Sequence, residues 1–454
     1  MQRKKIAIVL AAIIVAATYV GISNTSHLPN GTIDEKALFA LDEAGCVLCH
    51  TKDAKLPFYA KIPLVNIPIK ADISDGLKYF DITEAIKDIK EGKPANETVI
   101  AKIEYAVNNG TMPPTLFKAV HWKSNLTSEE KQIILDWISQ QRKILNAKSG
   151  VAEKFANEPI WPIPQKVDVD AQKARLGSIL YHHKALSGDG TVSCATCHPL
   201  DNAGTDSLQT STGIRNQKGD INAPTVFNAV FNVKQFWDGR AKNLKEQAGG
   251  PPMNPVEMDG GSWDAIAKRL SKDSSFAEDF KKVYPQGFTE ETITDAIAQF
   301  EKTLITPDSP FDRYLKGDDN AISAEAKKGY EIFKAANCSV CHAGQNIGGQ
   351  TFEYMGLQGN YFKDRGNVGK INDTGLASAT KDIRDERKFK TPTLRNIAHT
   401  APYFHDGSTK DLKQATEIMA KYQTGVKLSQ EDINNLVKFL ESLSGSWQNK
   451  PIKK

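Results

Sequence analysis

Residues 194–198 read CATCH, and this short stretch decides the fold, because C-x-x-C-H is the attachment signature of c-type haem. Two thiols add to the porphyrin vinyl groups, and the histidine binds the iron. The spacing returns at 46–50 (CVLCH) and 338–342 (CSVCH), so all six cysteines are used. Disulfides or zinc would need further ligands, and His182 and His183 are poor candidates. The sequence therefore predicts three covalently bound haems. Their attachment points and proximal ligands are Cys46, Cys49, His50, Cys194, Cys197, His198, Cys338, Cys341 and His342.

Helical patterns surround these motifs. LTSEEKQIILDWISQQ (126–141) opens with a capping box formed by Thr127 and Glu130, and apolar residues at helical spacing follow. LSQEDINNLVKFLESL (428–443) repeats this design with Ser429 as the cap. A helix-like segment also precedes each haem motif. These patterns predict a mainly α protein built from three cytochrome c-like haem domains.

Two proline-containing stretches suggest the domain boundaries. NEPIWPIPQ (157–165) is typical of a linker, and TPDSP (306–310) marks the next boundary. The predicted parts are an N-terminal segment (1–27), a monohaem domain (28–156), a domain around the second haem (157–306) and a domain around the third (307–454).

The N-terminus predicts export. After the basic MQRKK, residues 6–22 carry no charge and approach the length of a membrane-spanning helix. No clear small-residue cleavage site follows, so we expect an uncleaved anchor rather than a cleaved signal peptide. The positive-inside rule then places the haem domains on the periplasmic side of the bacterial inner membrane. The net charge of +4, with no basic cluster beyond the N-terminus, indicates no nucleic-acid partner.

The distal ligand distinguishes haems that transfer electrons from haems that react with a substrate. An iron with two strong axial ligands transfers electrons, whereas an iron with a vacant face can bind a substrate. For the first haem, the sequence TMPP indicates Met112, with His121 as the alternative. For the third haem, Met419 lies shortly before the closing helix and is favoured over Met355. Both haems are therefore expected to transfer electrons.

The second haem has no comparable distal ligand. Residues 199–225 contain neither methionine nor histidine, and Met253 and Met258 come only later, beside Glu257. A carboxylate in this Gly/Pro-rich loop is a candidate for work at an open haem face. The alternatives are a solvated loop carboxylate, or a methionine of this loop that reaches the iron.

Residues 166–445 resemble the bacterial dihaem cytochrome c peroxidases. The first domain resembles an added monohaem cytochrome, and the layout is similar to that of trihaem, membrane-bound quinol peroxidases. The stretches that carry the resemblance are GTVSCATCH (190–198), NAPTVFNAVFNVKQFWDGRAKNLKEQAGGPPMNPVEM (222–258), SPFDRYLKGD (309–318) and KTPTLRNIAHTAPYFHDGS (390–408).

The resemblance implies that hydrogen peroxide is reduced to water at the haem of His198. Glu257 matches the family's catalytic acid–base group, and Gln247 matches the glutamine that orients peroxide. Trp237 matches the tryptophan between the two haems.

The resemblance also implies a second haem and a calcium ion. His342 and Met419 match the ligands of the electron-transferring haem. Asn222 and the backbone carbonyls of Thr400 and Pro402 match the calcium site between the domains.

The sequence departs from the family pattern at one loop. Many members carry a histidine that blocks the peroxidatic iron until the partner haem is reduced, and here the matching residue is Ile214. This departure favours an open face without reductive activation. His405 matches a histidine of the interhaem region.

The expected donor is membrane quinol, and a soluble cytochrome c or copper protein is the alternative. Two rival functions remain. A MauG-like oxidase of protein side chains would carry tyrosine at the position of Met419, and a non-catalytic electron carrier would have three six-coordinate irons.

Overall fold

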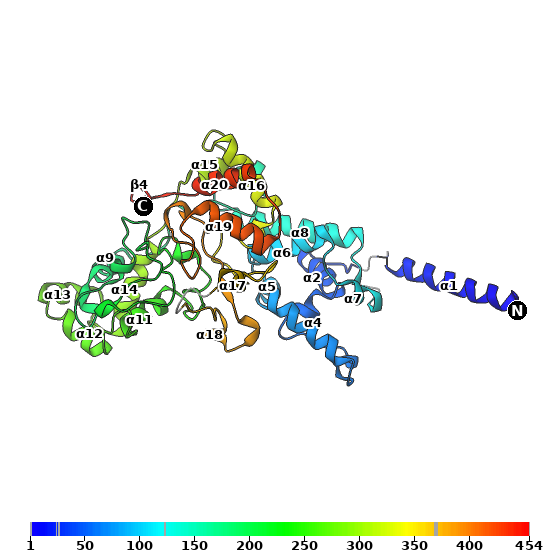
Figure 1. Ribbon diagram of the computed structural model, residues 1–454, viewed down its shortest axis with the longest axis horizontal. Coiled ribbons are helices and arrows are strands. Elements are labelled where there is room, and N and C mark those ends of the chain that lie inside the picture. The colour runs from blue at the N-terminus through cyan, green and yellow to red at the C-terminus, as the bar shows by residue number, and fades with distance from the viewer. Residues whose placement is uncertain (1, 24, 26–27, 122–123, 367–370, 454) are drawn as a thin grey trace. The chain divides into compact units, whose positions relative to one another are not determined.

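The protein is described here by a computed structural model. Its described residues are 2–23, 25, 28–121, 124–366 and 371–453. The chain divides into two compact units, Met1–Lys148 and Ser149–Lys454 (Figure 1). Unit 1 contains the first haem motif, and unit 2 contains the other two.

All the secondary-structure elements described in unit 1 are helical. Its elements are α1 (Gln2–Ser23), α2 (Ile33–Glu43), α3 (Cys46–His50), the 3-10 turn η1 (Phe58–Lys61), α4 (Asn66–Tyr79), α5 (Thr83–Lys90), α6 (Glu97–Asn109), α7 (Thr115–Val120) and α8 (Ser128–Asn146). The predicted capping box of α8 is confirmed: the Glu130 amide donates to Thr127 Oγ1 at 3.2 Å, and the Thr127 amide donates to Glu130 Oε2 at 2.8 Å. The fully buried Trp137 of α8 lies in the apolar core of this unit.

The predicted membrane anchor falls within α1. Across the part of the chain that the structure describes, no helix is both long enough and apolar enough to cross a membrane. The anchor at 6–22 stays a prediction from the sequence.

Unit 2 is also mainly helical. Its α-helices are α9 (Ala171–His182), α10 (Cys194–Cys197), α11 (Leu244–Met253), α12 (Trp263–Leu270), α13 (Ser274–Val283), α14 (Glu290–Lys302), α15 (Pro310–Leu315), α16 (Ala324–Ala335), α17 (Tyr361–Arg365), α18 (Ala377–Thr380), α19 (Leu412–Met419) and α20 (Gln430–Glu441). Two small antiparallel sheets pair β1 (Phe352–Tyr354) with β2 (Lys388–Lys390) and β3 (Ser446–Trp447) with β4 (Lys450–Pro451). The mainly helical fold predicted from the sequence is confirmed.

The two haem motifs of unit 2 follow helices that are packed in the same way. Helix α9 packs against α14, and α16 packs against α20. At each crossing a glycine lets the backbones approach: a Cβ on Gly177 would collide with the Ala296 carbonyl, and one on Gly329 with the Asn435 carbonyl. The same kind of helix crossing therefore occurs twice, once before the second haem motif and once before the third.

The stretch predicted to be a linker is part of the unit 2 core. Ile160 and Ile163 are buried, and Ile160 joins the apolar cluster around α16 and α20. The Gly344 amide donates to the Pro159 carbonyl at 2.8 Å, close to the third haem motif. The division between the compact units lies earlier, after Lys148. Proline content indicated a linker, but apolar residues between the prolines find partners far along the chain.

Candidate functional site

The three motif histidines are oriented by the same kind of contact. In each, Nδ1 lies within hydrogen-bonding distance of a backbone carbonyl oxygen. A carbonyl only accepts, so Nδ1 carries the proton and Nε2 keeps its lone pair, as an iron ligand requires. The pairs are His50 with Phe80 at 2.7 Å, His198 with Gly204 at 3.1 Å, and His342 with Ile347 at 3.2 Å.

The chemistry of these side chains fits c-type haem. Burial lowers the pKa of His50 and His198, and it lowers the pKa of His342 to about 4, so the imidazoles are neutral. Each of the six cysteines is a thiol rather than half of a disulfide. Burial raises the pKa of Cys46 and Cys197 to about 11. Neutral imidazoles beside paired thiols are the donor set that covalent haem attachment needs.

Helix α9 positions the second haem motif. Tyr181, fully buried in α9, donates its hydroxyl proton to the His198 carbonyl at 2.6 Å. Ser193 and Thr196 cap the short helix α10, which carries both thiols. The motif is thus held from the helix before it and from its own first turn.

Glu257 is partly buried, close to this motif. Burial raises its pKa, while Arg240 and a hydrogen bond from Asn254 act in the opposite direction. The side-chain Nδ2 of Asn254 donates to Glu257 Oε1 at 2.7 Å. The Glu257 charge also contributes to the raised pKa values of the Cys194 and Cys197 thiols. A carboxyl group with a raised pKa therefore lies within electrostatic reach of the haem attachment point.

The loop that departs from the family pattern is packed onto the Glu257 segment. The Ile214 amide donates to the Glu257 carbonyl at 2.9 Å, and a Cβ on Gly213 would collide with the Val256 carbonyl. Ile214 is fully buried in an apolar cluster that includes Met258. Met258 is therefore engaged in the core, whereas Met253 is 37% exposed at the end of α11.

Gln247 lies in α11, a helix that begins after the cap Asn243 and leads directly into the Glu257 segment. Its side chain is partly buried. The structure thus places both predicted peroxide-handling residues on one continuous stretch of chain, α11 and the loop that follows it.

Along the chain, Trp237 lies between the second and third haem motifs. Its indole N–H donates to the Asn222 carbonyl at 2.9 Å, and its ring packs edge-on against Phe389 and His405 at centroid distances of 6.4 Å. His405 stacks on Phe389 at 4.0 Å, and its Nε2 contacts Asp373 Oδ1 at 2.8 Å. The predicted interhaem residues Trp237 and His405 are therefore in contact with each other.

The predicted calcium residue Asn222 is hydrogen-bonded to the segment that follows Thr400 and Pro402 along the chain. The Asn222 amide donates to the His405 carbonyl at 2.8 Å. The side-chain Nδ2 of Asn222 donates to the carbonyl of Leu208 at 2.9 Å. This contact orients the amide and directs Oδ1 away from that carbonyl. Amide and carbonyl oxygens are suitable calcium ligands.

Both methionine candidates for the third haem border one apolar cluster. Met355 is buried in it, and Met419, the last residue of α19, packs against it. Other members of the cluster include Trp237 and Phe389. The structure brings both sulfur atoms to this region, and Met419 stays the prediction.

For the first haem, the surroundings of His121 favour Met112. His121 Nδ1 contacts the Phe117 carbonyl at 3.1 Å and therefore carries the proton, while Nε2 accepts from the Tyr59 hydroxyl at 2.6 Å. No lone pair is then left for iron. Met112 is 43% exposed.

Comparison with known proteins identifies relatives of this chain. A family profile described as di-haem cytochrome c peroxidase matches residues 171–320. Profiles described as a haem-binding domain and as cytochrome c match residues 6–140 and 326–444. The chain is 48% identical over 416 residues to cytochrome c peroxidase Ccp of Escherichia coli (strain K12), covering 91% of this chain and 88% of that protein.

The chain belongs to the di-haem cytochrome c peroxidase family. Cytochrome c551 peroxidase of Nitrosomonas europaea is 43% identical, covering 66% of this chain and 87% of that protein. Among solved structures, a MauG-like protein associated with microbial copper homeostasis matches with a TM-score of 0.54 and 26% identity, over 62% of this chain and 92% of its own. The predicted enzyme class, an oxidoreductase that acts on peroxide, and the c-type haem are thereby confirmed.

Several residues that contact the predicted site residues were not found from the sequence. Asn254 is hydrogen-bonded to Glu257, the candidate acid–base group. The sequence signal for Asn254 is its position three residues before Glu257. Arg365 forms ion pairs with Asp373 at 2.7 Å and with the buried Asp406 at 2.6 Å, behind His405. These partners come from different segments, so no local pattern indicates them.

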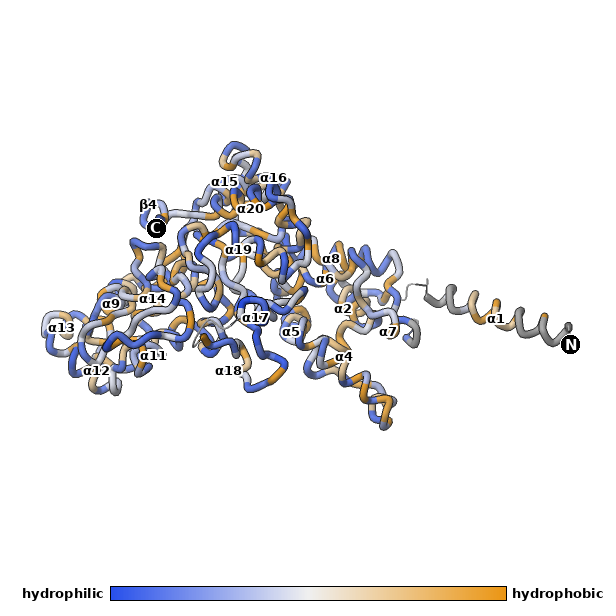
Figure 2. The backbone as a smooth tube through the Cα atoms, viewed as in Figure 1, coloured by the Kyte–Doolittle hydropathy of each residue, from blue (hydrophilic) through white to orange (hydrophobic). Residues whose placement is uncertain are grey.

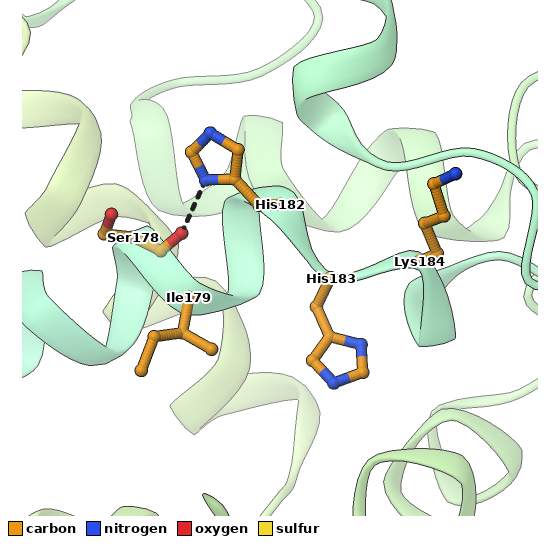
Figure 3. A pocket seen from close by; sticks show the side chains of 5 residues that line it. All are labelled: Ser178, Ile179, His182, His183 and Lys184. Carbon is orange, nitrogen blue, oxygen red and sulfur yellow. Dashed lines mark hydrogen bonds between the residues drawn. The ribbon is translucent and has the colours of Figure 1, made fainter.

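Figure 3 shows a surface pocket at the end of α9, lined by Ser178, Ile179, His182, His183 and Lys184. The two imidazole rings point to opposite sides of the chain. His182 Nδ1 contacts the Ser178 carbonyl at 2.9 Å. Within the described residues, no group of three or more His, Cys, Asp or Glu side chains could hold a metal ion. The pocket contains none of the predicted site residues, so we do not assign it to the peroxidase site.

Proposed function

We propose that this chain reduces one hydrogen peroxide to two waters, consuming two electrons and two protons, at the haem that His198 binds. The observation that carries the proposal is the setting of Glu257, a carboxyl group whose pKa is raised by burial and whose charge acts on the Cys194 and Cys197 thiols. When bound, the haem supplies the iron coordination position and the electrons for cleavage of the O–O bond.

Glu257 is the proton carrier in this proposal. It takes a proton from one peroxide oxygen and delivers it to the other, which leaves as water. The raised pKa suits both steps, because a group that titrates closer to neutral pH is populated in both forms. Asn254 holds Oε1, so Oε2 is the oxygen that faces the substrate.

Two further residues take part in the proposed reaction. Gln247, on α11, provides a neutral hydrogen bond that orients the peroxide. Trp237, which shares an apolar cluster with Met419, provides the route for electrons from the haem that His342 and Met419 would hold. Asn222 Oδ1 and the backbone carbonyls of Thr400 and Pro402 would hold a calcium ion, which would stabilise the segments around Trp237 and His405.

The full proposal has three haems. His50 and Met112 would hold the haem of unit 1, which would supply electron transfer from membrane quinol to unit 2; a soluble cytochrome c is the alternative donor. The protein acts on the periplasmic side of the bacterial inner membrane, because bacteria attach c-type haem outside the cytoplasm. The match of a haem-binding profile to residues 6–140 supports a haem in unit 1.

The test is Glu257→Gln in the haem-loaded protein. Haem content and the absorption spectrum should stay the same, while peroxide turnover should fall about 10²–10⁴-fold, the usual contribution of general acid–base catalysis. Glu246→Gln is the matched control, since Glu246 is an exposed carboxylate of α11. Turnover of Glu257→Gln within a few-fold of the control would reject the assignment.

A further inference from the structure

Unit 1 exposes an unusual number of large apolar side chains within one short segment, residues 55–70. A soluble surface tolerates single apolar residues, but a gathered set indicates a contact with another apolar body. The exposed side chains are Leu56 (40%), Phe58 (79%), Ile62 (44%), Leu64 (80%), Val65 (42%) and Ile67 (61%).

The 55–70 segment comprises η1 and the beginning of α4, at the end of α4 that projects from unit 1 (Figure 1). Figure 2 shows that this projecting end is hydrophobic. The other end of α4 contacts the first haem motif, where the Gly76 carbonyl lies 3.1 Å from His50 Nδ1. With a rise of 1.5 Å per residue, Ile67 lies about 13 Å along the helix from that contact. The exposed end of α4 therefore lies too far along the helix to contact the His50 motif.

The charges of the segment are all positive. Lys55, Lys61 and Lys70 flank the apolar residues, and no Asp or Glu occurs from 54 to 71. An apolar body flanked by lysines is suited to the boundary between acyl chains and headgroups of an anionic bilayer. A protein partner would have to offer an apolar face with acidic groups on both sides, whereas an anionic bilayer offers this combination everywhere.

One contact connects the segment to the predicted distal side of the first haem. The Tyr59 hydroxyl donates to His121 Nε2 at 2.6 Å, and the His121 ring stacks on Phe117 at 4.0 Å. Phe117 lies in α7, which begins at Thr115, three residues after Met112. The exposed segment is therefore tied to the part of the chain that carries the predicted methionine ligand.

We propose that residues 55–70 insert Phe58 and Leu64 into the surface of an anionic phospholipid bilayer, with Lys55, Lys61 and Lys70 on the headgroups. This contact deepens the donor side of the proposed function and rests on it for the electron route. It brings the first haem to the lipid phase, where quinol is dissolved. The lipid contact itself needs no electron transfer to be measured.

The test is hydrogen–deuterium exchange of the full-length, haem-loaded protein, read on the peptide that contains residues 55–70. The readout is local, so membrane binding by any other segment does not affect it. The protein is measured alone, with vesicles of phosphatidylethanolamine and phosphatidylglycerol, and with vesicles of phosphatidylcholine alone. We expect slower exchange of this peptide only with the anionic vesicles.

Substitutions separate the apolar and charged contributions. Phe58→Asp with Leu64→Asp should abolish the protection, and Lys61→Gln should raise the lipid concentration needed for half protection about fivefold. Ile383→Asp, at a residue of unit 2 that is 78% exposed, is the control and should change nothing. Equal exchange with and without anionic vesicles, protection already present without lipid, or equal protection by phosphatidylcholine would overturn the proposal.

Peroxide turnover with an artificial donor distinguishes failure of the proposed lipid contact from failure of the proposed function. The Phe58 and Leu64 variants should retain that turnover, because both residues lie outside the peroxidase site. Protection without turnover in the wild type would reject the peroxidase and leave the lipid contact standing.

Discussion

Glu301 lies in α14 with 5% of its surface exposed, and no hydrogen-bond partner for its Oε2 is found among the described residues. Burial raises its pKa to about 8. A negative charge on Glu301 would help to raise the pKa of the Cys194 thiol and of the Tyr181 hydroxyl. Glu301 is therefore a neutral carboxyl group at neutral pH, packed behind the second haem motif.

This carboxyl group should make stability depend on pH. The folded protein keeps the Glu301 proton up to about pH 8, whereas the unfolded chain releases it near the ordinary glutamate pKa of about 4.3. The folded state then binds more protons, so the free energy of unfolding falls as pH rises between these values, by up to about 1.4 kcal/mol per pH unit. Glu301→Gln should remove this contribution.

Denaturant unfolding from pH 5 to pH 8.5 checks this prediction. Glu331→Gln is the control, because the Glu331 side chain is 63% exposed. An unchanged pH profile in Glu301→Gln would show that Glu301 is ionised in the folded protein.

The short loop around Ile214 is predicted to decide whether the second haem has a closed face. Its backbone is fixed on the Glu257 segment, and the neighbouring Arg215 forms an ion pair with Asp259 at 2.8 Å. Arg215 is a cation, and isoleucine has no lone pair, so neither residue can bind iron. The oxidised wild type should therefore contain a high-spin second haem that binds cyanide without prior reduction.

The variant Ile214→His should add a low-spin ferric signal and a lag before turnover. Spin-resonance spectra and cyanide-binding rates of the oxidised proteins measure this. Three low-spin irons in the wild type, with slow cyanide binding, would contradict the prediction.

A buried ion pair joins four segments around the third haem motif. Arg395 contacts Asp312 of α15 at 2.6 Å, both side chains are fully buried, and Arg395 also donates to the carbonyls of Gln345 and Trp161. Asp312→Ala would leave the guanidinium charge buried without its partner. We expect a loss of about 3–5 kcal/mol in the free energy of unfolding.

Urea unfolding followed at the third haem measures this loss. The control is Asp319→Ala, which breaks the exposed pair between Lys154 and Asp319 and should cost less than about 1 kcal/mol. Equal losses in both variants would show that burial of the pair is unimportant.

At the level of the whole molecule, the division into two units predicts where the chain can be shortened. A chain that begins at Ser149 keeps Ile160 and Trp161, and it should reduce peroxide with an artificial donor but not with quinol. A chain that begins at Lys166 loses both core residues and should unfold at lower denaturant concentration.

Steady-state assays with both donors and urea midpoints test this. Quinol oxidation by the chain that begins at Ser149 would show that unit 1 does not receive the electrons. Equal midpoints for the two shortened chains would show that residues 149–165 contribute nothing to the core.

The sequence by itself determined the haem motifs, the helical class, the capped ends of α8 and α20, and the family. These features depend on residues that are close together along the chain: two thiols and a histidine in five residues, or a cap and its partner three residues apart. Covalent spacing and local hydrogen bonds are visible in such short stretches.

Only the tertiary structure decided the protonation and surroundings of these groups. The carbonyls that fix the motif histidines, the hydroxyl of Tyr59 on His121, and the burial that raises the pKa of Glu257 all depend on folding. The same holds for residues 157–165, which contain linker-like prolines but pack into a core. Burial and partner choice arise from segments brought together by folding, and no window of sequence contains both partners.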